Sequence, residues 1–97
     1  MRVEFTLERR WSASAVKSFQ KGGLWDSVYA ASRGKLWVKY RKYESQESQK
    51  EAIEKLSKKS KSFDYRIVDV LIKGKERTKF IGGMDKRLLK KVEEGKE

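Results

Sequence analysis

The chain contains no cysteine, no histidine and no proline. Without cysteine and histidine it forms no disulfide and lacks the usual groups of a nucleophilic triad and of a zinc site. No stretch approaches the roughly 18 apolar residues of a membrane span, and no apolar signal-peptide core follows Met1. We therefore expect an intracellular protein, cytoplasmic or nucleoid-associated. We expect it to need no cofactor, metal ion or membrane, and no small-molecule substrate is evident.

Carboxylates arranged for catalysis are scarce as well. Asp64 and Asp69 are the best candidates for the magnesium site of a nuclease, but neither begins the acid-x-Lys spacing of restriction-like nucleases. The one such spacing, Glu94-Gly95-Lys96, lies in the tail. We therefore predict that the protein is not an enzyme. A small metal-free ribonuclease that uses Arg, Lys and Tyr stays open as an alternative.

Acidic residues are fewest where basic residues are most frequent. The chain carries 25 Lys and Arg against 14 Asp and Glu, a formal net charge of +11, and its pI is about 10.0. Asp26 is the one acidic residue between Arg9 and Tyr43. Aromatic residues interleave this basic stretch at Trp11, Phe19, Trp25, Tyr29, Trp37, Tyr40 and Tyr43. Cations release counterions from a polyanion and aromatic faces stack on bases, so the stretch predicts nucleic-acid binding.

Length and patterning predict a single small basic α+β domain over residues 1–97. The expected elements are a strand over 2–9, a helix capped by Ser12 or Ser14, a hairpin of strands 25–31 and 36–43, a helix over 45–60 with a capping box at Ser48, strands over 65–72 and 77–81, and a last helix capped by Asp85. The first six elements match a ferredoxin-like βαββαβ core with an antiparallel sheet. An additional C-terminal strand and helix follow, and the strand over 77–81 should make the doubly apolar strand over 65–72 internal.

One segment of the expected hairpin resembles a known family. The residues Arg33-Gly34-Lys35-Leu36-Trp37-Val38-Lys39-Tyr40 are similar to the third-strand octapeptide of RNA-recognition motifs. Lys35 and Leu36 depart from that pattern, and Glu4 stands where the family has an exposed aromatic residue. The resemblance covers eight residues. It implies that Trp37 faces outward and stacks on a base, while Leu36, Val38 and Tyr40 point to the core.

Three groups of residues make up the predicted nucleic-acid surface. They are Arg9 and Arg10 at the end of the first strand; Arg33, Lys35, Trp37, Lys39 and Arg41 along the hairpin; and Lys73, Lys75, Arg77 and Lys79 on the second hairpin. In a regular strand Lys35, Lys39 and Arg41 share a face with Trp37, and Lys42 points to the other side. The competing interpretations are that Trp11 packs against the following helix, that lysines protect an edge strand, and that hairpin tips are charged for solubility.

These observations favour a non-catalytic nucleic-acid-binding protein, with RNA or single-stranded DNA ahead of duplex because sheet aromatics stack on unpaired bases. A duplex-DNA-binding architectural or regulatory protein is the second hypothesis, and an interaction module for an acidic protein partner is the third.

The last helix has basic residues at its start and acidic residues at its end, which opposes its dipole. It should persist only by docking Met84, Leu88, Leu89 and Val92, within the chain or in a homodimer.

Overall fold

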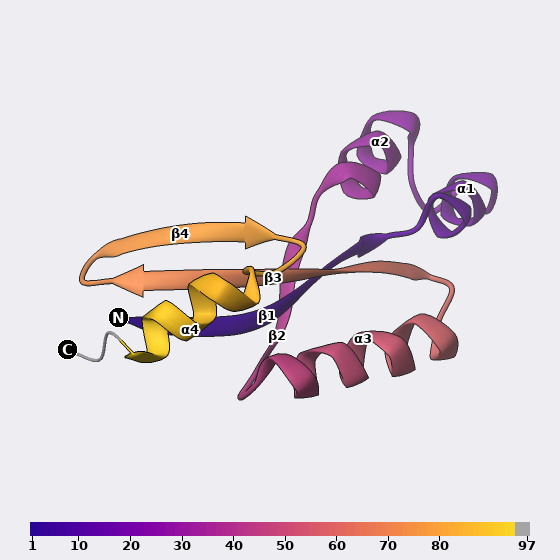
Figure 1. Cartoon of the computed structure of the whole chain (residues 1–97). Coiled ribbons are helices and arrows are strands. Elements are labelled where there is room, and N and C mark those ends of the chain that lie inside the picture. The colour runs from indigo at the N-terminus through magenta and orange to yellow at the C-terminus, as the bar shows by residue number, and fades with distance from the viewer. Residues whose placement is uncertain (95–97) are drawn as a thin grey trace.

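Eight elements follow one another along residues 1–94, the part of the chain that the structure, a computed structural model, describes (Figure 1). They are β1 (Arg2–Trp11), α1 (Ala13–Lys21), α2 (Ser27–Lys35), β2 (Val38–Tyr43), α3 (Gln46–Lys59), β3 (Phe63–Lys73), β4 (Glu76–Ile81) and α4 (Lys86–Glu94). The strands form one antiparallel sheet in the order β2-β1-β3-β4. The α+β class, the antiparallel sheet and the internal position of β3 are therefore confirmed.

The predicted strand over 25–31 is wrong, because this segment begins α2. Its aromatic and β-branched residues favour a strand, but Asp26 caps a helix by accepting the backbone N–H of Tyr29 at 2.8 Å. α2 also packs tightly on α1, since a side chain at Gly34 would stand 3.2 Å from Val16 Cγ2. The element order thus becomes β-α-α-β-α-β-β-α, and the ferredoxin-like order is not confirmed.

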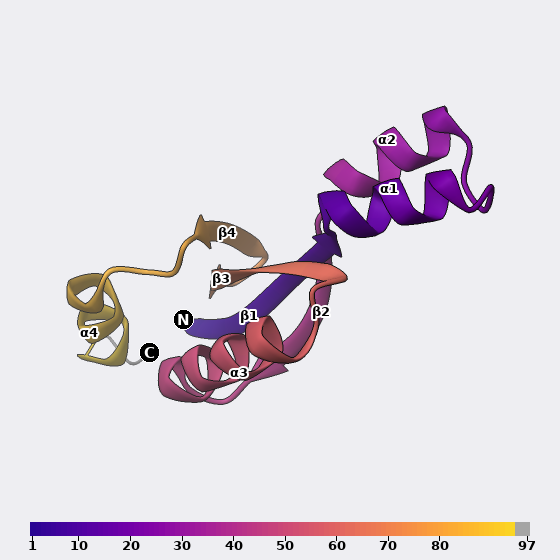
Figure 2. The same cartoon turned by 90° about the vertical axis from the view of Figure 1, so that its right-hand side faces the viewer.

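The helices α1 and α2 form a hairpin that stands off one end of the sheet (Figures 1 and 2). Ser12 caps α1 as predicted, and Gly22 follows its last residue. The ring of Trp11, at the end of β1, lies edge-on to Phe19 at 5.0 Å and to Trp25 at 5.5 Å, and stacks on Phe63 of β3 at 4.3 Å. Trp11, Phe19 and Trp25 of the basic stretch thus form with Phe63 a small second core, the hairpin core, between the helical hairpin and the sheet, as the packing interpretation of Trp11 expects.

One face of the sheet is covered by α3 (Figure 2). Asp69 of β3 points to this face, because its carboxylate accepts a hydrogen bond from Gln49 Nε2 of α3 at 2.9 Å. Phe5 lies opposite Asp69 and Leu7 opposite Ile67, so the apolar side of β1 packs on the same helix. The cap of α3 is Ser45, which accepts the N–H of Ser48, so the helix begins earlier than the predicted capping box.

A β-bulge in β2 changes which side chains share a face. Leu7 pairs with Arg41 and Glu8 pairs with Lys39, so Tyr40 is the extra residue. Arg41 therefore lies on the α3 side, whereas Lys39 lies on the opposite side, which we call the open face. Lys42 pairs with Thr6 and also lies on the open face. The prediction that Lys39 and Arg41 share one face, with Lys42 on the other, is wrong.

The C-terminal helix is anchored at its start. Met84 is buried, and its N–H donates to Asp69 Oδ2 at 2.7 Å while its carbonyl accepts from Gln46 Nε2 at 3.4 Å. Asp85 caps α4 as predicted by accepting the N–H of Arg87. Leu88, Leu89 and Val92 remain half-buried, so docking within the chain is partial and the homodimer stays a prediction. Within residues 1–94, no helix is both long and apolar enough to cross a membrane.

Candidate nucleic-acid interface

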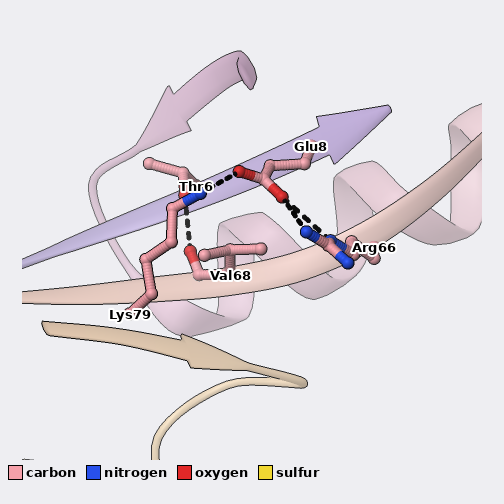
Figure 3. A network of polar contacts seen from close by, with 5 residues as sticks. All are labelled: Thr6, Glu8, Arg66, Val68 and Lys79. Carbon is pink, nitrogen blue, oxygen red and sulfur yellow. Dashed lines mark hydrogen bonds and ion pairs between the residues drawn. The ribbon is translucent and has the colours of Figure 1, made fainter. Parts of the chain in front are cut away.

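Two glutamates on β1 organise the open face of the sheet. Glu4 accepts hydrogen bonds from Lys42 Nζ at 2.9 Å and from Arg77 at 2.6 Å. Glu8 binds Arg66 at 2.6 Å and Lys79 Nζ at 2.7 Å (Figure 3). Arg77 and Lys79 belong to β4, so these ion pairs reach across β3.

The ion pairs explain how apolar side chains on the open face are buried although no helix of residues 1–94 covers this face. Val68 is fully buried and Val70 is 6% exposed, and their register places both on the open face, opposite Thr6 and Glu4. Lysine and arginine bury their methylene stems while their charged ends stay at the surface. The stems of Lys79 and Arg77 therefore cover the valines as their charged ends reach the glutamates.

Hydrogen bonding holds both glutamates in the charged form. The hydrogen bond from Lys42, aided by Arg77, lowers the pKa of Glu4 from its ordinary 4.5 to about 2, despite partial burial. Burial alone would raise the pKa of Glu8, but hydrogen bonds from Lys79 and Arg66 outweigh it and leave that pKa below its ordinary value. Both carboxylates are thus anionic at neutral pH, and they neutralise part of the charge predicted for the second hairpin.

This arrangement predicts a loss of stability in acid. Because the folded pKa of Glu4 lies below its ordinary value, its contribution is complete above about pH 4.5 and is lost as the pH falls to about 2. We expect Glu4→Gln to flatten the pH dependence of the unfolding free energy in that window, measured by urea titration. Glu44→Gln is the matched control, because Glu44 is exposed and makes no ion pair within residues 1–94. An unchanged profile for Glu4→Gln would contradict the prediction.

The structure gathers seven of the predicted site residues around two hollows that meet at Val38 and Lys39. The first, which we call the basic hollow, has a volume of about 180 Å³ and is lined by Arg9, Arg10, Trp11, Arg33, Leu36, Val38, Lys39 and Phe63. The second, the sheet hollow, has a volume of about 490 Å³ and is lined by Thr6, Glu8, Trp37, Val38, Lys39, Val70, Arg77 and Lys79. The two residues that the linings share, Val38 and Lys39, stand at the start of β2.

The other four predicted site residues lie elsewhere. Lys35 is the last residue of α2 and not part of a strand. Arg41 lines a shallow hollow with Glu51 and Lys55 of α3 on the opposite side of the sheet. Lys73 and Lys75 are exposed at the turn between β3 and β4 and line neither hollow. These four are therefore not part of the gathered site.

The two hollows differ in charge. The basic hollow is lined by four cationic side chains and, among the described residues, by no acid. Arg9, Arg33 and Lys39 make no ion pair in the part of the chain that the structure covers. Arg10 pairs with Asp64 at 3.3 Å, with both side chains more than a third exposed. The sheet hollow contains Glu8, which is already bound to Lys79. Of the two hollows, the basic hollow therefore carries more unneutralised positive charge.

Most aromatic faces near the site are already occupied. Guanidinium groups of Arg10 and Arg66 lie 4.5 Å and 4.4 Å from the centre of the Trp37 ring. The guanidinium of Arg9 lies 4.4 Å from the Tyr40 ring and 4.3 Å from the Phe63 ring. The rings therefore orient arginines through cation–π contacts. This leaves less aromatic surface for bases than the sequence predicts.

The segment that resembles an RNA-recognition motif is placed differently from the expectation. Arg33–Lys35 lies at the end of α2, and the strand begins at Val38. Leu36 is 52% exposed and Val38 is 50% exposed, so their implied core positions are wrong. Tyr40 is the bulged residue and contacts Tyr65 at 5.8 Å on the α3 side.

Sequence reasoning missed Arg66 and Lys42. Arg66 alternates with Val68 and Val70 along β3, and this period of two could have placed it on the open face. Lys42 lies opposite Thr6, and the bulge, which has no clear signal in the sequence, puts Lys39 on the same face as Lys42. Within residues 1–94, no three acidic side chains gather in a way that could hold a metal ion.

Comparison with known proteins adds no relative. No protein-family model matches the chain, and searches of curated proteins and of solved structures find no match. The resemblance to RNA-recognition motifs therefore stays a prediction.

Proposed function

We propose that this protein binds nucleic acid, with RNA or single-stranded DNA preferred, and catalyses no reaction on it. The observation that carries the proposal is the basic hollow, where Arg9, Arg33 and Lys39 converge without a carboxylate partner among the described residues. Charged groups that the protein leaves unpaired keep their full attraction for phosphate. A flexible strand enters hollows of this kind more easily than a rigid duplex does.

Duplex binding is the second candidate, and one observation favours it. The rings that would stack on unpaired bases already contact arginines or one another. A protein that contacts only phosphates binds a duplex as readily as a single strand. Competition among single-stranded RNA, single-stranded DNA and duplex of matched length distinguishes these forms. If duplex competes best, the single-strand preference is wrong.

Binding should depend strongly on salt. A protein that neutralises about six phosphates or more loses roughly 10³-fold in affinity between about 50 and 200 mM salt, because bound counterions return to the nucleic acid. We expect a loss of this size in fluorescence-anisotropy titrations with a single-stranded oligonucleotide. An affinity that does not change over this range would argue against a phosphate interface and favour an acidic protein as the partner.

Paired substitutions should locate the interface. In Arg33→Gln/Lys39→Gln two unpaired cations of the basic hollow are lost, and we expect the slope of log affinity against log salt to fall by about two. Lys73→Gln/Lys75→Gln is the matched control, because it removes the same charge from an exposed turn that lines neither hollow. Equal slope changes in both variants would show that net charge, and not the basic hollow, drives binding.

A further inference from the structure

We propose that the basic hollow holds a terminal phosphate monoester of the bound strand, so that the protein recognises a phosphorylated end. This inference rests on the proposed function and specifies its ligand. It follows from the size of the basic hollow, from its unsatisfied donors and from its charge.

The basic hollow is small and closed on one side by aromatic packing. Its volume of about 180 Å³ is well under half that of the sheet hollow. Trp11 and Phe63, which form part of its wall, stack on each other at 4.3 Å, and Trp11 is held in turn by Phe19 and Trp25. An internal phosphodiester needs room for the chain to enter and to leave. A terminal phosphate needs only one opening, which suits a small hollow backed by a packed wall.

The guanidinium of Arg9 is held in place in this hollow, but its N–H groups have no acceptor among residues 1–94. Its guanidinium lies 4.4 Å from the Tyr40 ring and 4.3 Å from the Phe63 ring, which restrict its position. The side chain is half-buried, yet within residues 1–94 it makes neither a side-chain hydrogen bond nor an ion pair. Guanidinium presents five N–H donors in a planar fork that matches phosphate oxygens. An anion in the basic hollow would satisfy donors that the protein orients but leaves open.

Charge favours the monoester over the diester. A phosphate monoester carries about −1.5 to −2 charges at pH 7 and has three acceptor oxygens, whereas an internal diester carries a single charge. Arg9, Arg33 and Lys39 together offer three cations that no carboxylate among the described residues offsets. Lys39 also lines the sheet hollow, so a strand that starts in the basic hollow would continue past Lys39 toward Trp37 and Lys79.

The test compares strands that differ only at their ends. A single-stranded RNA of fixed sequence is prepared with a 5′-phosphate, with a 3′-phosphate, and with hydroxyl groups at both ends, and each is titrated by fluorescence anisotropy. We expect at least one phosphorylated strand to bind roughly tenfold tighter than the hydroxyl strand, the effect of about one charge-assisted hydrogen bond. Arg33→Gln should remove that preference, because Arg33 lines only the basic hollow. Lys75→Gln should keep it.

The outcomes separate this inference from the proposed function. If all three strands bind equally and with the same salt dependence, the protein binds nucleic acid but the terminal-phosphate site is wrong. If no strand binds, the proposed function itself is wrong. A preference that survives in Arg33→Gln would place the end-recognition site outside the basic hollow and would also overturn the inference.

Discussion

Replacement of Trp11 by alanine should lower the free energy of unfolding by about 3 kcal/mol, the lower end of the range for removing a buried aromatic side chain. The lower end applies because the ring is half-buried. Trp11 contacts Phe19 of α1, Trp25 of the loop before α2, and Phe63 of β3. Loss of this ring removes the aromatic contacts that join the helical hairpin to β3. Urea denaturation followed by far-UV circular dichroism measures the effect.

Trp37→Ala is the matched control, because it also removes one tryptophan of the basic stretch. The Trp37 ring contacts two guanidinium groups, and an exposed cation–π contact contributes about 0.5–1 kcal/mol. We therefore expect a clearly smaller loss of stability than for Trp11→Ala. Equal losses in the two variants would mean that Trp37 also belongs to a core, and the division between the hairpin core and the open face would be wrong.

Local sequence patterns correctly predict the elements whose residue pattern fits only one kind of secondary structure. The alternation in β1, the apolar run of β3 and the turn before β4 were each correctly placed, because burial on one face or on both directly sets the spacing of apolar residues. The segment Ser27–Lys35 has no such clear period. Its tyrosine and valine favour a strand, and the helix forms instead because of the Asp26 cap and the close approach of Gly34 to Val16. Gly34 and Val16 belong to different helices, and the helix and strand propensities of a single segment do not include such a contact.

The sequence predicts that the candidate site is made of basic and aromatic residues. It does not predict which of those residues lie together at the site. Charge density marked all of the basic residues equally. Which cations are neutralised depends on pairs such as Glu4 with Arg77 and Glu8 with Lys79, which are 73 and 71 residues apart in the sequence. The bulge at Tyr40 then decides which side chains of β2 reach the open face. Neither the long-range pairing nor the bulge follows from the pattern of a single segment.

A second large effect is expected at Asp69, a fully buried residue of β3. Its carboxylate accepts from Gln49 Nε2 at 2.9 Å and from the Met84 N–H at 2.7 Å, so it links α3 and the C-terminal segment to the sheet. Asp69→Ala leaves two buried donors short of an acceptor, and each such loss costs about 1–3 kcal/mol. We expect a total loss of about 3–5 kcal/mol in the free energy of unfolding. Asp69→Asn keeps an acceptor oxygen and nearly the same volume, and should lose less.

Hydrogen exchange tests whether Asp69 also anchors α4. Met84, just before this helix, hydrogen-bonds to Asp69 and Gln46, whereas Leu88 and Val92 of the helix are half-buried. An anchor that depends on one buried acceptor should open locally when the acceptor is removed. In Asp69→Ala we expect amides from Met84 to Glu94 to exchange faster at low protein concentration, by a larger factor than amides in the middle of β1. Protection of α4 that persists in the variant and grows with protein concentration would instead show that a second copy covers the helix, as the predicted homodimer requires.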